Sequence, residues 1–390
     1  MGTNKQSIES IGHALAFAVE PGGLNLENLL PEDGALRIRT TARALTGMQK
    51  EAIIQHGPTG AVWRVVCDEG PWLNGTDLAP FPLAFFAAGL AASLLSQILG
   101  EAGDRGVGID SLSLVQDNFF TMEGSALRGT MAAGVQPMQV NISLQGNATA
   151  AEFEDIAKTA LRDRCPAVRC LQEALASGFT IRANDEDLPW SGEAATHLAD
   201  VAFPVGLFDR IRPASTAGAA IIRKTGSDAN SNAPAVGLKT EQKRIVHVHT
   251  EGMIRDDGMK SIKVQCIQPQ GSCFQMLSDD SRAAGGQERA PDGLAYLAAG
   301  VAFCFMTQIG RYAQITRQKL NGYRIIQDTT HPLSRNGKPG SDPLGVETLV
   351  SVDTEEPPEK SIKLVQMGEQ TCYVHAAFRT AVETEISFHT

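Results

Sequence analysis

The chain has 390 residues, of which 43% are apolar and 20% charged, a balance typical of a soluble globular protein that builds a full core. Its 34 basic and 44 acidic residues leave a formal net charge of −10. Nucleic acids and anionic membrane surfaces select basic patches, so neither is expected as a partner. Seven scattered cysteines exclude a small disulfide scaffold, and without a visible signal peptide we expect a cytoplasmic protein.

Two segments near the N-terminus, residues 35–40 and 61–66, alternate apolar and polar side chains and are predicted as half-buried strands. The apolar run that follows, residues 78–99, is almost long enough to span a membrane. Two prolines near its start and three polar residues near its end shorten the uninterrupted part. We therefore expect the buried central helix of a soluble domain.

Strands are predicted next at residues 109–116 and 140–144, again from alternation. Residues 150–177 have apolar side chains at helical spacing. Thr149 is the predicted N-cap of this helix, and Gly178 is the predicted stop.

The central apolar segment occurs twice in the chain. Residues 79–98 and 290–309 are identical at ten of twenty positions when shifted by 211. The same shift aligns polar flanking pairs, Gly47-Met48 with Gly258-Met259 and Gln116-Asp117 with Gln327-Asp328. Both the apolar helix and the polar segments around it match at the same shift, which indicates that a domain has been duplicated. The duplication is a single one, because stacked repeats have far shorter periods.

The second copy repeats the order of the first, with strands predicted at 244–249, 261–267, 323–327 and 347–352 and a last helix over about 358–382. Strands on both sides of a long buried helix predict an α+β fold. The first copy spans about residues 30–185 and the second 243–390. Residues 186–242 connect them, and 214–236 have the composition of a linker.

This arrangement resembles the OsmC/Ohr family, the osmotically induced and organic-hydroperoxide-resistance proteins. The resemblance covers most of both copies. Residues 251–258 are similar to the family's Arg-Asp-Gly hairpin, and 290–304 to its proline-then-apolar helix with the peroxide-reacting cysteine. Residues 371–375 resemble the helix of the second cysteine, and 164–168 the family's Cys-Pro pattern.

Family members are usually intertwined homodimers with two active sites at the subunit interface. The resemblance therefore implies that this tandem chain is an intramolecular pseudo-dimer of two OsmC-like domains, open to further self-association. It also implies a thiol peroxidase of the oxidative stress response. Its substrate would be an organic hydroperoxide and its partner a dithiol reductant, and no cofactor is implied.

Cys304 and Cys372 are the candidate redox pair. A buried free cysteine is by itself more often a small core residue. The resemblance assigns Cys304 as the thiol that attacks the O–O bond and becomes a sulfenic acid. It assigns Cys372 as the thiol that condenses with it to a disulfide.

Cys304 lies well inside its helix, where the helix dipole helps little, so a nearby cation is needed to activate it. Arg255 matches the family's activating arginine by resemblance. Arg289 and Arg311 are alternatives because they are near Cys304 in sequence. An ordinary solvated arginine is the competing interpretation for each.

The family also uses a carboxylate just after the helix proline to hold that arginine. Asp292 follows Pro291, but it lies further from Cys304 than the family pattern has it, so Glu288 is the second candidate. His375 shares a helical face with Cys372 and is a candidate to tune that thiol, although an ordinary helix histidine is the favoured interpretation.

The first copy departs from the family pattern. Ser93 stands where Cys304 stands in the second copy, and a serine forms neither a sulfenic acid nor a disulfide. Cys165 therefore has no redox partner. We expect the first copy to be catalytically inactive and to complete the interface, with Arg43 as its candidate contribution to the site.

No zinc site is expected, because the sequence has no Cys-x-x-Cys pair. His247 and His249 alternate along one strand face, but without a nearby carboxylate we expect no metal there. No phosphate-binding or dinucleotide-binding loop is recognised either.

The alternative function is non-enzymatic. The first copy has lost its reactive cysteine, and the second copy has Gly293 at the position of the helix proline Pro82. Both departures are compatible with a protein that binds a small apolar ligand at the interface between the copies. The two functions differ in whether Cys304 and Cys372 are within disulfide reach, which needs Cα atoms no more than about 7 Å apart.

Overall fold

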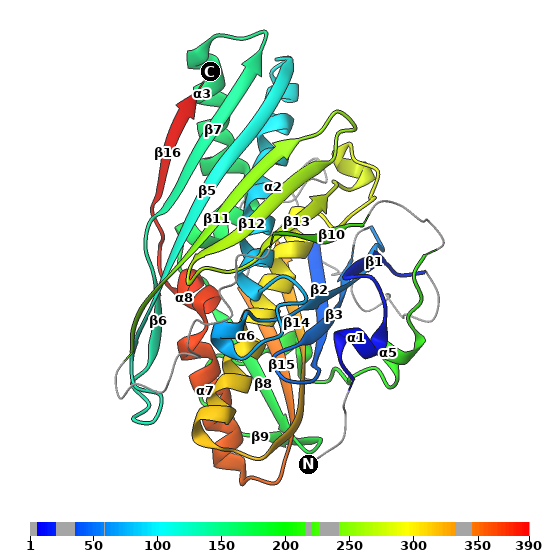
Figure 1. Cartoon of the computed structure of the whole chain (residues 1–390), viewed down its shortest axis with the longest axis vertical. Helices are drawn as coiled ribbons and strands as arrows, with labels where there is room; N and C mark the ends of the chain where they lie inside the picture. The colour runs from blue at the N-terminus through cyan, green and yellow to red at the C-terminus, as the bar shows by residue number, and fades with distance from the viewer. Residues whose placement is uncertain are drawn as a thin grey trace.

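The computed structural model describes residues 6–20, 36–57, 59–214, 220–226, 242–331 and 345–389. Two mixed sheets enclose two long helices, α2 (Pro82–Asp104) and α6 (Gly293–Thr316) (Figure 1). This confirms the predicted α+β fold with a long apolar helix in each copy. Strands β2, β3 and β4 precede α2 in the chain, and β11, β12 and β13 precede α6 in the same way.

Two sheets contain all of the strands in the described residues. The first has the order β1 (Ala16–Ala18), β4 (Val62–Cys67), β3 (Lys50–His56), β2 (Leu36–Ala44), β14 (Leu320–His331), β15 (Gly345–Thr354), β8 (Ser177–Ala183), β9 (Glu186–Leu188). The second has the order β10 (Ile222–Gly226), β13 (Cys273–Ser278), β12 (Lys260–Gln268), β11 (Gln242–Ile254), β5 (Ile109–Gly124), β7 (Met138–Gly146), β16 (Thr384–His389), with β6 (Ala132–Val135) on β5.

Each sheet is assembled from both copies of the repeat. In the first sheet β2 pairs antiparallel with β14, so that Arg39 lies opposite Asp328. In the second sheet β11 pairs antiparallel with β5, so that His249 lies opposite Asp117. The two copies are therefore intertwined, as a pseudo-dimer within one chain, and neither has a sheet of its own.

Helices α2 and α6 lie in the core. Both are long and apolar enough to cross a membrane, but 78% and 94% of their most apolar windows are buried inside the protein. This agrees with the prediction of a central core helix. α2 begins with Pro82 in its first turn, whereas α6 is capped by Asp292, whose carboxylate accepts a hydrogen bond of 2.7 Å from the Ala295 amide.

Glycines let the backbones of α2 and α6 come into direct contact. A Cβ on Gly89 would lie 2.5 Å from the Leu297 nitrogen, and one on Gly300 would lie 2.5 Å from the Phe86 nitrogen. These two glycines are equivalent positions of the repeat. The contact is therefore pseudo-symmetric and tolerates no side chain at either position.

The helices after the central strands are interrupted where the sequence predicts continuous ones. Residues 150–177 form α3 (Ala150–Thr159), a π-helical turn (Ala160–Arg164) and α4 (Pro166–Gln172). Thr149 caps α3 as predicted, but the predicted stop at Gly178 is wrong because β8 already begins at Ser177. Pro166 lacks an amide hydrogen and pushes Cys165 into extended backbone, which ends the helix early.

The last helix is interrupted at the matching position. α7 (Pro358–Thr371) and α8 (Tyr373–Arg379) are separated by Cys372, which is extended at φ −76° and ψ 120°. The prediction of one helix over 358–382 is therefore wrong. No proline follows Cys372, so the break comes from tertiary packing and not from the local sequence. Both breaks place a cysteine directly before a short helix.

The connecting segment is more ordered than its linker composition predicts. β10 lies within residues 214–236 and pairs with β13 at the end of the second sheet, while residues 215–219 and 227–241 lie outside the described part. Within the described residues, the remaining short elements are α1 (Ile8–Ile11), α5 (Leu207–Arg210) and three 3₁₀ turns (Pro71–Leu73, Thr196–Leu198, Arg282–Ala284).

We expect Gly300→Ala to destabilise the protein by about 1–3 kcal/mol, because the methyl group would force the two helix backbones apart. Gly103→Ala, in the partner helix α2, is the control. Its Cβ would meet nothing within 4 Å, so it should be neutral or stabilise slightly. Urea unfolding measures both variants, and equal stability of the two would contradict this account of the helix contact.

Candidate active site

Cys304 and Cys372 lie together at the centre of the second copy. Cys304 is in the middle of α6 and is 2% exposed, and Cys372 is fully buried in the break between α7 and α8. Their thiols are close enough to hydrogen-bond to each other, and both are free cysteines. The structure thus brings together the two cysteines that the sequence pairs.

The two thiols of this pair differ in acidity. Burial and the hydrogen bond to Cys372 raise the pKa of Cys304 well above its ordinary value. Burial also opposes ionisation of Cys372. The hydrogen bond from Cys304 and the charge of His375 outweigh it and hold the pKa of Cys372 well below its ordinary value. Cys372 is therefore the more acidic thiol of the pair.

His375 comes from the first turn of α8 and is fully buried. Its ring lies 5.3 Å from that of Phe305 and 5.8 Å from that of Phe179, measured between centroids. These aromatic walls exclude water from the imidazole, which strengthens its effect on the neighbouring thiol. His375 is therefore placed to tune Cys372, one of the two roles left open for it.

A cavity of about 20 Å³ lies against Cys304, between the two copies. A volume of this size holds roughly one water molecule. The first copy supplies six of its lining residues and the second copy the other six: Glu69, Trp72, Leu73, Phe81, Pro82 and Leu83, and Val246, Cys266, Cys304, Thr307, Gln308 and Tyr373.

Charged groups from both copies surround this cavity. Glu69, buried in the first copy, accepts a hydrogen bond of 2.8 Å from the Thr307 hydroxyl in α6. Burial raises the pKa of Glu69 against the opposing charges of Lys50 and Arg311. Burial lowers the pKa of Arg311, and the charges of Tyr373, Glu69 and Cys304 oppose that shift. Arg311, one of the three arginine candidates, thus lies in the electrostatic surroundings of Cys304.

Lys50 is fully buried on β3, and its ammonium group donates a hydrogen bond of 2.6 Å to the Met48 carbonyl. Sequence reasoning missed both Lys50 and Glu69, because they belong to the copy that lacks the reactive cysteine. The repeat could have pointed to Glu69. The shift of 211 aligns it with Asp280, so an acidic residue is present at this position in both copies.

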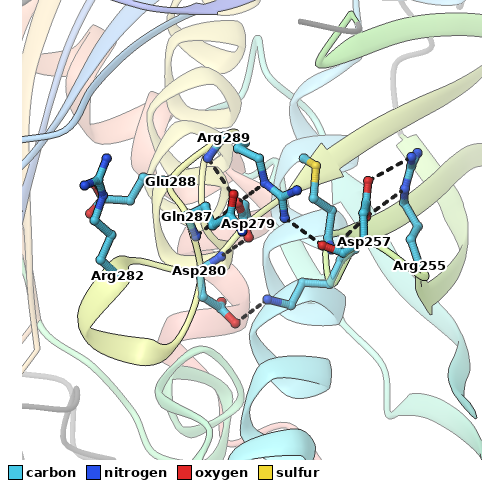
Figure 2. Close-up of polar contacts among 10 residues, drawn as sticks. Arg255, Asp257, Asp279, Asp280, Arg282, Gln287, Glu288 and Arg289 are labelled. Atoms are coloured by element: carbon cyan, nitrogen blue, oxygen red, sulfur yellow. Dashed lines mark hydrogen bonds and ion pairs between the residues drawn. The ribbon is translucent and has the colours of Figure 1, made fainter. Parts of the chain in front are cut away.

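The other predicted site residues contact different partners (Figure 2). Arg255 pairs with Asp257 at 3.1 Å on the exposed β11–β12 hairpin. Glu288 pairs with Arg282 at 3.5 Å, and Asp292 caps α6 and lies 3.3 Å from the imidazole of His56. In the described part of the chain, the hydrogen bonds and ion pairs of these three side chains go to groups other than Cys304 and Cys372.

Two further arginines are also engaged away from the cysteine pair. The alternative candidate Arg289 pairs with Asp279 at 2.7 Å and donates to the Asp257 carbonyl (Figure 2). Arg43 pairs with Glu51 and stacks over the Phe208 ring, 4.4 Å from its centroid. Arg43 therefore belongs to another contact network, and the first copy contributes Glu69 and Lys50 instead.

The first copy retains part of the same arrangement, with a serine in place of the reactive cysteine. The Cys165 thiol lies 3.3 Å from the Ser93 hydroxyl, the counterpart of the Cys372–Cys304 contact. Ser96 donates to Asp280 at 2.7 Å, the counterpart of Thr307 and Glu69, and Lys260 pairs with that same aspartate. The site of the first copy therefore keeps the pairing at the cysteine and the hydroxyl–carboxylate contact. It lacks the sulfur at position 93, and Val168 and Gly100 stand where the second copy has His375 and Arg311.

A larger cavity of about 1000 Å³ lies between the copies elsewhere, and its lining includes neither redox cysteine. Its lining includes Arg43, Arg317, Arg324, Asp185 and Asp209. These charged groups do not fit the small apolar ligand of the alternative function.

The model of the OsmC-like protein family matches the chain twice, over residues 75–177 and 285–387. The chain belongs to the OsmC-like protein family. The two matches confirm the tandem duplication, and each contains one central helix and one cysteine-containing break.

A crystal structure of an OsmC-like hydroperoxide resistance protein from Jannaschia sp. CCS1 is similar at 18% identity and a TM-score of 0.21. The match covers 33% of this chain and 81% of that one. No curated protein is similar enough to the chain to be matched to it.

We expect Ser93→Cys to create a second oxidisable pair, because the serine hydroxyl already lies 3.3 Å from the Cys165 thiol. Mild oxidation followed by peptide mass spectrometry should then show a disulfide between positions 93 and 165. Ser93→Ala is the control and should show none. Oxidation of Cys304 and Cys372 in the same sample without a bridge at 93 and 165 would contradict the equivalence of the two sites.

Proposed function

We propose that the protein is a thiol-dependent peroxidase that reduces organic hydroperoxides through Cys304 and Cys372. The observation that supports this most is the buried thiol pair, which lies beside a cavity that residues of both copies line, Glu69 of the first copy among them. A pair that served only to fill the core would need neither Glu69 nor Arg311 in its surroundings.

Cys304 is the attacking thiol in this proposal, since it lines the cavity. Its proton passes to Cys372, and its sulfur attacks the terminal peroxide oxygen. The O–O bond breaks, the sulfur becomes a sulfenic acid, and the alcohol leaves after taking up a proton. Cys372 then attacks the sulfenic acid sulfur, which releases water and forms the disulfide. A dithiol reductant exchanges with that disulfide and restores both thiols.

Two neighbouring groups support the first step. Arg311 provides positive charge that stabilises a thiolate on Cys304 and the developing alkoxide. The Tyr373 hydroxyl is buried at the cavity and has no hydrogen-bond partner among the described residues, so it is free to donate to a peroxide oxygen. Arg255, Glu288 and Asp292 remain candidates by resemblance, although their contacts favour Arg311 and Glu69 in these roles.

The substrate preference follows from the cavity wall. Trp72, Leu73 and Phe81 give it apolar surface that suits an alkyl chain better than water. The cavity, at about 20 Å³, has room for the O–O group of a hydroperoxide but not for its alkyl group. The alkyl group would fit only if the 3₁₀ turn Pro71–Leu73, which forms part of the wall, moved outward. The small volume also disfavours the alternative function of storing an apolar ligand. We propose a cytoplasmic location from the charge and cysteine content.

We expect one equivalent of cumene hydroperoxide to consume two thiols of the reduced protein and to link Cys304 to Cys372. Stopped-flow kinetics with peptide mass spectrometry measures this, and hydrogen peroxide should react more slowly. Cys372→Ser should stop at a Cys304 sulfenic acid, whereas Cys304→Ser should not react. Thiols that stay reduced for minutes would overturn the function, and a sulfenic acid only at Cys372 would reverse the two roles.

We expect His375→Gln to shift the pH profile of this reaction to higher pH. The substitution removes the charge that lowers the pKa of Cys372, so less thiolate is present near neutral pH and alkaline buffer restores it. His331→Gln is a matched control, because His331 is also buried but lies on β14. Peroxide consumption measured across pH tests this, and an unshifted profile in a folded His375→Gln protein would contradict the role of His375.

A further inference from the structure

A second cluster of titratable side chains lies on the outer face of the second sheet, away from the thiol pair. The Asp117 carboxylate oxygen Oδ1 lies 2.6 Å from His247 Nε2 and 2.8 Å from His249 Nδ1. The three ligand atoms all lie within 4.8 Å of one another. All three side chains are half-buried, with 23–31% exposure, so a small solute can still reach them.

The sheet brings this cluster together from both copies. His247 and His249 project from β11 of the second copy, and Asp117 lies directly opposite His249 on β5 of the first. Phe119 stacks on the His247 ring with centroids 4.5 Å apart, which fixes the orientation of that imidazole. The third member of the cluster does not lie beside the histidine pair in the sequence. The pairing of β11 with β5 brings it there, as the carboxylate of Asp117, which is 130 residues from His247.

The first sheet contains the same constellation with different chemistry. Asp328 is the repeat equivalent of Asp117, and it faces Arg39 at 2.7 Å and Arg37 at 4.0 Å. A guanidinium group has donors only and cannot ligate a metal, whereas a neutral imidazole offers a lone pair. The duplication therefore provides two cross-copy clusters of one geometry, of which only the histidine cluster can bind a cation.

We propose that Asp117, His247 and His249 form a site for a divalent transition-metal ion of the zinc class. Imidazole nitrogen and carboxylate oxygen are zinc ligands at about 2.0–2.2 Å, and three such ligands leave a fourth position for water. Zinc would take the place of the two imidazole protons that now hydrogen-bond to Asp117 Oδ1, and the three side chains would need to move only slightly.

Glu251 provides an outer contact for the site. Its carboxylate lies 3.6 Å from Nε2 of His249, the ring nitrogen that faces away from the cluster. Such a partner holds a ligating imidazole in the tautomer that presents its other nitrogen to the metal. The bound ion would join β5 of the first copy to β11 of the second, and so connect the halves of the chain.

Isothermal titration of the chelator-treated, full-length protein with Zn²⁺ tests the proposal. We expect one ion per chain and a melting temperature that rises with zinc concentration. Asp117→Asn and His249→Gln should each weaken binding by about 100-fold or more, since even outer partners are worth roughly 10–100-fold. His197→Gln is the matched control, because His197 pairs with Glu347 at 2.8 Å without a third ligand.

Co²⁺ distinguishes this site from the cysteines. Cobalt held by nitrogen and oxygen shows d–d bands without a thiolate charge-transfer band, and the spectrum should persist in Cys304→Ser/Cys372→Ser. Binding that survives in folded Asp117→Asn, a thiolate band that disappears with the cysteines, or no binding at all would each overturn the proposal. The outcome is independent of whether the thiol pair reduces peroxides.

Discussion

The direct contact between the backbones of α2 and α6 is the constraint on which the rest of the molecule depends. Gly89 and Gly300 remove the side chains that would separate the two helices. With the helices in contact, the strands before each helix reach across to pair with the strands that follow the other helix. The thiol pair and its cavity lie where α6 meets the first copy, so the site exists only in the assembled pair.

Joining two subunits in one chain allows the two sites to diverge. A homodimer must place the same residue at both interfaces, whereas this chain carries Cys304 at one site and Ser93 at the other. Some supporting groups are retained, since Ser96 and Asp280 still repeat the contact of Thr307 and Glu69. Others are not, since Val168 and Gly100 stand where the second copy has His375 and Arg311. Loss of one sulfur has thus left an interface that still packs and still pairs its charges.

The sequence predicts whatever the duplication repeats locally: the central helices, the strand order around them and the two cysteines. It does not predict partners that meet only through strand exchange. Thr307 and Glu69 are 238 residues apart, and Asp117 and His249 are 132 apart, so neither pair follows from spacing. The break at Cys372 was also missed, because no proline or glycine marks it and packing imposes it.

The exchange of strands also determines when parts of the fold can form during synthesis. β2 leaves the ribosome early, but its neighbour β14 follows about 290 residues later. At 5–20 residues per second, the β2 edge and the apolar face of α2 stay uncovered for about 15–60 s. An open edge beside bare apolar surface is a template for aggregation. A nascent chain of this design is therefore exposed to aggregation until its second half emerges.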